Sequence, residues 1–346
     1  MKSLLIATVL FAATTAAHAQ AQLKLPEQSP AASVTQTVGL TEITVNYHRP
    51  AVAGRRIWGE LVPYNQPWRA GANENTTIKF SSDVKVGGKP LHAGTYGIHM
   101  IPTAKDWTIA FSTMTTAWGS FTYDQKEDAQ RITVTPRAVA TAEERLAYRF
   151  DDPSDTKATL VLAWEKLAVP IAIEVETPKV VMASMRGQLR GVAGFSWQAY
   201  NQAASYWVKN AGPLDEAMKL ADRSIAMNAT YANQNTRATI LEKQGNAKAA
   251  AELRARILPL AGENDLNQLA YQLIGEKKLD EAAQLLQQAA EKFASSWNAQ
   301  DSYGEVLALK GDKPGAIAAY SKALALVKDP VQKKRIEDTL AKLKAS

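Results

Sequence analysis

A short segment in the first half of the chain combines side-chain types that proteins use to recognise small polar molecules. Between Trp68 and Glu74 the sequence supplies an indole, a guanidinium, a side-chain amide and a carboxylate. An aromatic plane stacks on a sugar or another flat group, and a guanidinium holds a carboxylate through paired hydrogen bonds. The same side chains also satisfy the backbone groups of a loop that lacks sheet hydrogen bonds. The segment is therefore either a ligand site or a self-supporting loop.

Residues of similar chemistry surround this segment and extend the candidate site. The candidate ligand-binding residues are Arg49, Arg55, Trp58, Trp68, Arg69, Asn73, Glu74, His99 and Trp118. The basic residues Arg49, Arg55 and Arg56 either converge on an anion or form a solvated rim. The sequence assigns a catalytic role to none of them.

The histidines do not follow a metal-binding pattern. Apart from His18 they are His48, His92 and His99, and there is no His-Glu-x-x-His motif. Zinc requires three or four convergent ligands, so no metal is predicted. His48 and His99 fall on the polar faces of predicted strands, where isolated surface histidines are the simpler interpretation. Should the two meet across a sheet, Glu74 is the carboxylate that would complete a site.

Motifs for other chemistry are absent from the sequence. It contains no Gly-x-Ser-x-Gly elbow, phosphate-binding loop or dinucleotide fingerprint, so no cofactor is predicted. The lack of cysteine excludes thiol chemistry and disulfides. The 40 Lys and Arg against 34 Asp and Glu give a net charge of +6. Because these charges are interspersed rather than clustered, nucleic-acid binding is not predicted.

The first residues have the pattern of a secretory signal peptide. Lys2 gives a positive start, Leu4 begins a short apolar run, and Ala17-His18-Ala19 forms a small-x-small cleavage site. No later segment reaches the ~20 consecutive apolar residues of a membrane helix. The sequence therefore predicts residues 1–19 to be removed and the mature protein to be periplasmic or secreted, without a membrane span.

The mature chain is predicted to form two domains, since 346 residues with 46% apolar content exceed one compact core. From about Ser33 to Glu176 apolar and polar residues alternate in roughly nine short segments, as in half-buried strands. Without helical crossovers, residues 26–176 are predicted to be an antiparallel β-sandwich or jelly-roll-like barrel. The stretch from Gly54 to Asn75 interrupts the pattern and is either a functional loop or a compact insertion.

A helical pattern replaces the alternation after a glycine-containing linker over residues 177–195. Alanines recur at intervals of 32, 33 and 34 residues, at Ala217, Ala249, Ala282 and Ala316. This period is typical of helical hairpins that stack into an array, with one small residue permitting close helix contact. The predicted hairpins span 196–227, 231–259, 265–293 and 297–327, followed by a capping helix to about residue 344. The whole chain is thus an α+β multidomain protein.

The third and fourth hairpins contain the motifs Leu279-Asp280-Glu281-Ala282 and Gly315-Ala316-Ile317, with Gly304 as a small residue on a first helix and Tyr320 as an aromatic residue on a second. These residues resemble the tetratricopeptide repeat. In the second unit Arg237 takes the place of the small residue. The resemblance implies that polar residues early in the first helices line a concave face. These candidate partner-binding residues are Asn201, Asn233, Asn235 and Asn267. Surface solvation explains them equally simply.

The β half contains a series of short motifs in a fixed order. They are Arg49-Pro50, Gly54-Arg55, Ile57-Trp58-Gly59, Leu61 to Tyr64, Trp68 to Thr76, Gly94 to Gly97, Ile101-Pro102, Trp107 and Trp118-Gly119. With these motifs the β half resembles a family of exported bacterial proteins catalogued as domain of unknown function 2911. The resemblance covers about residues 26–176 and implies a fold and an exported location. It implies no activity, because none is assigned to the family.

The sequence favours an exported binding or scaffold protein over an enzyme. In this interpretation the helical hairpins dock a protein or peptide, and the β domain holds a small polar ligand or glycan. The alternative is an envelope enzyme that acts on a carbohydrate or another envelope component. Its centre would be the loop with Trp68, Arg69, Asn73 and Glu74, with His48 or His99 nearby. If these side chains converge in one pocket, the enzyme interpretation is favoured. If they are dispersed into salt bridges, the scaffold interpretation is favoured.

Overall fold

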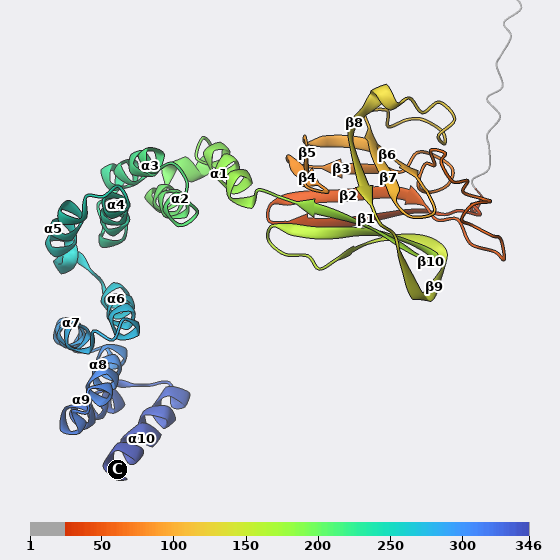
Figure 1. The fold of residues 1–346 in the computed structure, drawn as a ribbon. Helices are drawn as coiled ribbons and strands as arrows, with labels where there is room; N and C mark the ends of the chain where they lie inside the picture. Colours follow the sequence, from red (N-terminus) through yellow and green to blue (C-terminus); the bar gives the residue numbers. More distant parts are fainter. Residues whose placement is uncertain (1–24, 346) are drawn as a thin grey trace, which may run out of the picture. The chain divides into compact units, whose positions relative to one another are not determined.

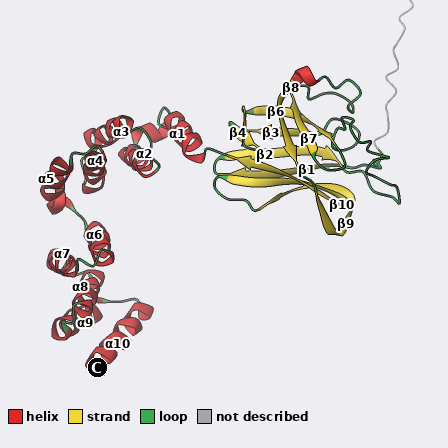
Figure 2. Ribbon diagram, viewed as in Figure 1, coloured by secondary structure: helices red, strands yellow, loops and turns green. Residues whose placement is uncertain are grey.

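The computed structural model describes residues 25–345, so the predicted signal peptide lies outside the described residues. The chain divides into two compact units, with the boundary between Thr177 and Pro178. The first unit is built of strands and the second of helices (Figures 1 and 2). The predicted α+β multidomain class is confirmed.

The β unit contains two antiparallel sheets. The larger has the order β1-β2-β3-β6-β7-β8, made of β1 (Ala31–Val38), β2 (Thr41–His48), β3 (Thr77–Phe80), β6 (Gly94–Ile101), β7 (Trp107–Ser112) and β8 (Asp128–Val134). The smaller has the order β5-β4-β10-β9, made of β4 (Val84–Val86), β5 (Lys89–Leu91), β9 (Arg137–Asp151) and β10 (Lys157–Glu174). The arrangement is a sandwich rather than a closed barrel.

Alternating burial places the core between the sheets. In β2, Ile43, Val45 and Tyr47 are buried, whereas Glu42 and Asn46 are exposed. Tyr47 meets Tyr148 of the smaller sheet edge to face, with ring centroids 4.8 Å apart. Burial of one face in strands such as β2 explains why the period-two pattern predicted this fold.

The strand predictions differ from the structure at the sheet edges. Strands β1 and β5 were not expected: β1 is rich in Thr, Gln and Ala and mostly half exposed, and β5 contains Pro90, which donates no ladder hydrogen bond. Residues 159–164 and 171–175 count as two of the nine segments of the predicted alternation, but a single strand, β10, runs through the first and into the second. Its register shifts around Glu165, which has φ +55°, so the alternation is broken midway although the strand continues.

Ten α-helices make up the described part of the second unit. Helix α1 (Thr177–Gln188) begins it, and the four hairpins are α2 (Trp197–Lys209) with α3 (Leu214–Met227), α4 (Tyr231–Lys243) with α5 (Ala247–Ile257), α6 (Glu263–Gly275) with α7 (Leu279–Lys292), and α8 (Trp297–Leu309) with α9 (Lys313–Leu326). Helix α10 (Pro330–Ala345) closes the array. Over residues 25–345 no helix is long and apolar enough to cross a membrane.

The segment expected to be a linker, residues 177–195, contains α1 and a 3-10 turn at Val192–Phe195. Met182 of α1 joins the apolar cluster formed by Ala203, Trp207 and Ala217. The helix is therefore part of the array, because it covers an apolar face of the first hairpin that would otherwise meet water.

The repeat register needs one correction, in the second hairpin. Ala249 is exposed, and the buried alanine is Ala250. Like Ala217, Ala282 and Ala316, Ala250 donates its backbone N–H to the carbonyl four residues earlier, at the start of its helix. Twelve or thirteen residues before these alanines, the first helices have the small residues Ala204, Ala238, Ala270 and Gly304. Arg237 therefore does not replace a small residue, because Ala238 occupies that position and is fully buried.

Candidate functional site

Four tryptophans form an aromatic cluster at one end of the β-sandwich. Trp58 lies edge to face against Trp68, Trp107 and Trp164 at centroid distances of 5.9, 4.9 and 5.8 Å. Trp68 and Trp164 stack at 5.9 Å with an interplanar angle of 19°. The loop from Gly54 to Asn75 is thus a compact insertion whose indoles extend the core of the sandwich.

Backbone pairing fixes the position of Trp68 and its neighbours. Trp68 exchanges two backbone hydrogen bonds with Met100 of β6, each 2.8 Å long. Ala70 has φ +53°, and its carbonyl accepts a 2.9 Å hydrogen bond from the buried Tyr148 hydroxyl. Arg69 lies between these two anchored residues, so its backbone is held while its side chain remains available.

A cavity of about 750 Å³ lies beside this loop. Its lining includes the predicted residues Arg55, Trp68, Arg69 and Asn73, with two residues that the sequence did not single out, Arg145 and Trp164. No acidic residue and no histidine is among its lining residues. The cavity therefore has cationic and aromatic walls.

The three arginines of the cavity differ in how they are used. Arg55 donates to the carbonyls of Ala51 at 2.5 Å and Val52 at 3.1 Å. Arg145 donates through Nη1 to the carbonyls of Gln28 at 3.0 Å and Arg49 at 3.2 Å. These two side chains therefore bond backbone carbonyls of residues 28, 49, 51 and 52, which precede the loop from Gly54 to Asn75.

Arg69 supports no backbone group. Its Nε is buried without a hydrogen-bond partner, and the guanidinium makes no hydrogen bond or ion pair with residues 25–345. The guanidinium carbon lies 5.7 Å from the centre of the Trp118 ring, a cation–π contact. A Cβ at Gly119, where φ is +81°, would lie 3.1 Å from Arg69 Nη1, so glycine allows the close approach. Burial lowers the pKa of Arg69 because it removes water from the charged form.

Arg49, Trp58 and Trp118 lie outside the cavity. Arg49 donates from Nε to the Leu146 carbonyl at 2.9 Å. Trp58 belongs to the tryptophan cluster. Trp118 is 63% exposed and stacks on Phe121. Asn73 does line the cavity, but its Nδ2 donates to Glu27 and to the Ser29 carbonyl.

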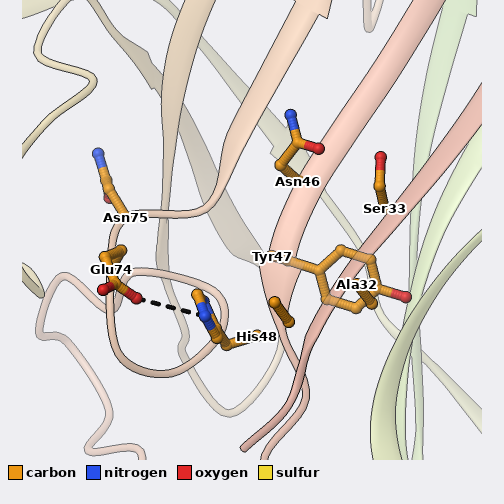
Figure 3. A pocket seen from close by; sticks show the side chains of 8 residues that line it. Ala32, Ser33, Asn46, Tyr47, His48, Glu74 and Asn75 are labelled. Carbon is orange, nitrogen blue, oxygen red and sulfur yellow. Dashed lines mark ion pairs between the residues drawn. The ribbon is translucent and has the colours of Figure 1, made fainter. Parts of the chain in front are cut away.

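Glu74 points to a different place, a shallow pocket of about 440 Å³ over β1 and β2. There the Glu74 carboxylate lies 3.3 Å from His48 Nε2, and Glu27 lies 3.4 Å from the same nitrogen (Figure 3 shows the Glu74 contact). Asn46 and Asn75 line the same pocket. Within residues 25–345 no group of three or more His, Cys, Asp or Glu is arranged to hold a metal ion.

His99 is a buried residue, in contrast to the isolated surface histidine that the strand pattern favoured. It is 2% exposed, its Nδ1 lies 2.7 Å from Ser120 Oγ, and its ring packs 4.8 Å from that of Tyr123. The connection between β7 and β8 supplies both partners and covers the second face of the larger sheet. Burial lowers the pKa of His99 to about 4. The covering segment has no periodicity, so the sequence pattern of β6 alone could not reveal it.

The helical unit places the predicted asparagines in two kinds of environment. Asn233 is fully buried; it caps α4 with Thr230 and donates to Ser224 Oγ at 2.9 Å, so it is a structural residue. Asn201, Asn235 and Asn267 are half-buried and each is the fifth residue of a first helix. The first helices α2, α4, α6 and α8 line the inner side of the curve of this unit (Figure 1).

These three amides form a row of incompletely bonded groups. The Oδ1 atoms of Asn201 and Asn267 are buried without a partner, and their Nδ2 groups form no hydrogen bond with residues 25–345. Asn235 accepts a 3.4 Å hydrogen bond from Arg254. In the last hairpin the equivalent residue is Asp301, which pairs with Arg335 of the closing helix at 2.6 Å. The row of available amides therefore ends where α10 begins to cover it.

These features define a β-sandwich with a polar aromatic cavity followed by an array of helical hairpins. Residues 29–173 match the model of the family described as "Protein of unknown function (DUF2911)", which confirms the resemblance of the β half. No curated protein matches the chain.

Solved structures similar to the chain include tetratricopeptide proteins. The crystal structure of YrrB, described as a TPR protein with an unusual peptide-binding site, is 19% identical, with a TM-score of 0.29, over 46% of this chain and 84% of YrrB. Pseudomonas aeruginosa pilF is 16% identical with a TM-score of 0.30, over 44% of this chain and 69% of pilF. A crystal structure of MamA is 13% identical with a TM-score of 0.29, over 48% of this chain and 92% of MamA.

Proposed function

We propose that this protein is an exported binding protein whose helical hairpins hold an extended peptide segment of a protein partner. The observation that carries the proposal is the row of amides at the fifth position of the first helices. A peptide backbone offers one carbonyl acceptor and one N–H donor per residue. Side-chain amides that have no internal partner are complementary to both groups.

Binding is favoured over catalysis by the content of the β-domain cavity. General acid–base catalysis requires a titratable group within hydrogen-bonding reach of the substrate. The cavity residues include arginines, tryptophans and an asparagine, but no carboxylate and no histidine. The enzyme interpretation placed Glu74 and either His48 or His99 beside Trp68 and Arg69. Glu74 pairs with His48 in the separate pocket over β1 and β2, and His99 bonds Ser120, so none of the three lines this cavity.

Export forms part of the proposal and rests on the sequence of the first residues. The signal-like pattern ends at Ala19, with a second small-x-small site ending at Ala21. N-terminal sequencing of the protein recovered from the cell envelope or medium should therefore begin at Gln20 or Gln22. Recovery of only the uncleaved chain from the cytoplasm would refute the export part of the proposal.

The peptide site is tested by selection from a random peptide library on the full mature chain. Each hydrogen bond to a neutral amide contributes about 1 kcal/mol, so the double variant Asn201→Ala/Asn267→Ala should bind the selected peptides on the order of tenfold to thirtyfold more weakly. The matched control is Asn264→Ala, since Asn264 is exposed on the same helix as Asn267. An array that selects no peptide, or peptides that bind the double variant as tightly as wild type, would refute the proposal.

A further inference from the structure

The buried side-chain polar atoms that lack a partner around the β-domain cavity are all hydrogen-bond donors. They are the guanidinium of Arg69, whose Nε is buried, and the buried indole Nε1 of Trp164; Trp58 Nε1, in the adjoining tryptophan cluster, is also buried and unpaired. Guanidinium and indole groups can only donate hydrogen bonds. An orphaned buried donor raises the free energy of the folded chain unless an acceptor reaches it. The natural occupant of this cavity is therefore rich in acceptor atoms.

The charge of the lining residues indicates that the occupant is also an anion. Arg55, Arg69 and Arg145 all line the cavity, and its lining includes no carboxylate to neutralise them. Arg55 and Arg145 bond backbone carbonyls, and neither forms an ion pair with a carboxylate within residues 25–345. Low-dielectric walls strengthen the attraction between such cations and a bound anion.

The size and the apolar walls exclude an inorganic ion as the full occupant. A cavity of about 750 Å³ falls in the range of small-molecule sites. Trp68 lines it with a half-buried indole that stacks on the buried Trp164, and Leu61 adds exposed aliphatic surface. Flat apolar walls beside cationic groups fit a molecule that joins a ring to a carboxylate.

We propose that the cavity of the β domain binds a small carboxylate attached to a ring, with Arg69 as the main anion-binding residue. The carboxylate lies against the Arg69 guanidinium, and the ring lies along Trp68, which Trp164 supports from behind. This site belongs to the β unit and is independent of the peptide site proposed for the helical unit.

The test is calorimetric titration of the full mature chain with 1-naphthoate and glucuronate, which carry an aromatic ring and a sugar ring. Their uncharged counterparts 1-naphthamide and glucose, and inorganic phosphate, serve as reference probes. At least one carboxylate should bind at least tenfold more tightly than its uncharged counterpart and than phosphate. If only naphthoate binds, the cavity prefers an aromatic ring. If only glucuronate binds, the cavity prefers a sugar ring.

Two variants separate the role of Arg69 from general charge. Arg69→Gln should weaken binding of the carboxylate at least tenfold, and Arg69→Lys should weaken it nearly as much, because lysine lacks the paired donors. Arg56→Gln is the matched control, since Arg56 is exposed, pairs with Glu60 and does not line the cavity. The Arg56→Gln protein should bind the carboxylate as tightly as wild type does.

A measurement on the wild-type chain keeps the proposal testable if Arg69→Gln fails to fold. The bound carboxylate should protect Arg69 from modification by phenylglyoxal, as read by peptide mapping, while Arg56 reacts at an unchanged rate. The proposal is overturned if no carboxylate binds at millimolar concentration, if the uncharged counterparts bind equally well, or if Arg69 is not protected.

Discussion

At the scale of single residues, His99 shows how a covering segment changes the chemistry of a side chain. The ring is enclosed between β6 and the connection that carries Ser120 and Tyr123. Because a charged imidazolium would lose its water there, the neutral form is favoured and the pKa falls to about 4. The Ser120 hydroxyl then bonds a neutral ring, which places this residue among the structural groups of the β domain.

The depressed pKa makes the stability of the β domain depend on pH. As the pH falls below about 6.5, the unfolded chain takes up a proton at His99 before the folded chain does, so the stabilisation present above about pH 6.5 is lost toward pH 4. Between about pH 7 and pH 5 this residue should cost about 2 kcal/mol of unfolding free energy. Urea unfolding of wild type and His99→Gln at the two pH values measures the difference.

The control for this experiment is His92→Gln, because the His92 side chain is 91% exposed. The unfolding free energy of His92→Gln should change between the two pH values as it does in wild type. In His99→Gln this change should be smaller by about 2 kcal/mol. Equal pH dependence in wild type and His99→Gln would show that the histidine titrates normally in the folded protein.

At the scale of elements, the sequence predicted the positions of the helices more accurately than which side of each helix is buried. All four hairpins and the closing helix lie where the apolar period placed them. Helix α5 is the exception in register, because three consecutive alanines from Ala249 to Ala251 do not mark which residue is buried. Arg254 adds to the ambiguity, since it stands four residues after Ala250, where the other hairpins have Ala221, Leu286 and Tyr320.

Close helix contact in the fourth hairpin depends on Gly304. A Cβ at this position would lie 3.0 Å from the Tyr320 ring of the facing helix. Gly304→Val should therefore overpack the contact and lower the unfolding free energy of the helical unit by about 1–3 kcal/mol. Chemical denaturation followed by circular dichroism at 222 nm, where helices dominate the signal, measures this change.

Gly275 provides the matched comparison, since nothing lies within 4 Å of an added Cβ there. Gly275→Ala should leave the helical unit unchanged or stabilise it by up to about 1 kcal/mol, because alanine restricts the unfolded chain more than glycine does. A Gly304→Val protein as stable as wild type would mean that α8 and α9 do not approach each other at this residue.

At the scale of the whole molecule, the cavity shows where local pattern stops being informative. Arg55, Trp68, Arg69 and Asn73 come from one segment, and their chemistry was readable from their types and proximity. Arg145 and Trp164 lie in β9 and β10, and only the pairing of Ala51 with Arg145 and the packing of the two sheets bring them to the cavity. Contacts between residues this distant in sequence depend on sheet topology, which alternation does not encode.

The two units have separate cores, which leads to a prediction for unfolding. Ile78 is fully buried in the β-sandwich, and Leu286 is fully buried in the helical array. Truncation of either to alanine leaves a cavity and should cost about 2–5 kcal/mol, but only in the unit that contains it. Differential scanning calorimetry of the full chain should then show two transitions, with Ile78→Ala lowering one midpoint and Leu286→Ala lowering the other. A single transition that both variants shift to the same extent would mean that the sandwich and the array unfold as one cooperative body, because a cavity in one unit would then destabilise both.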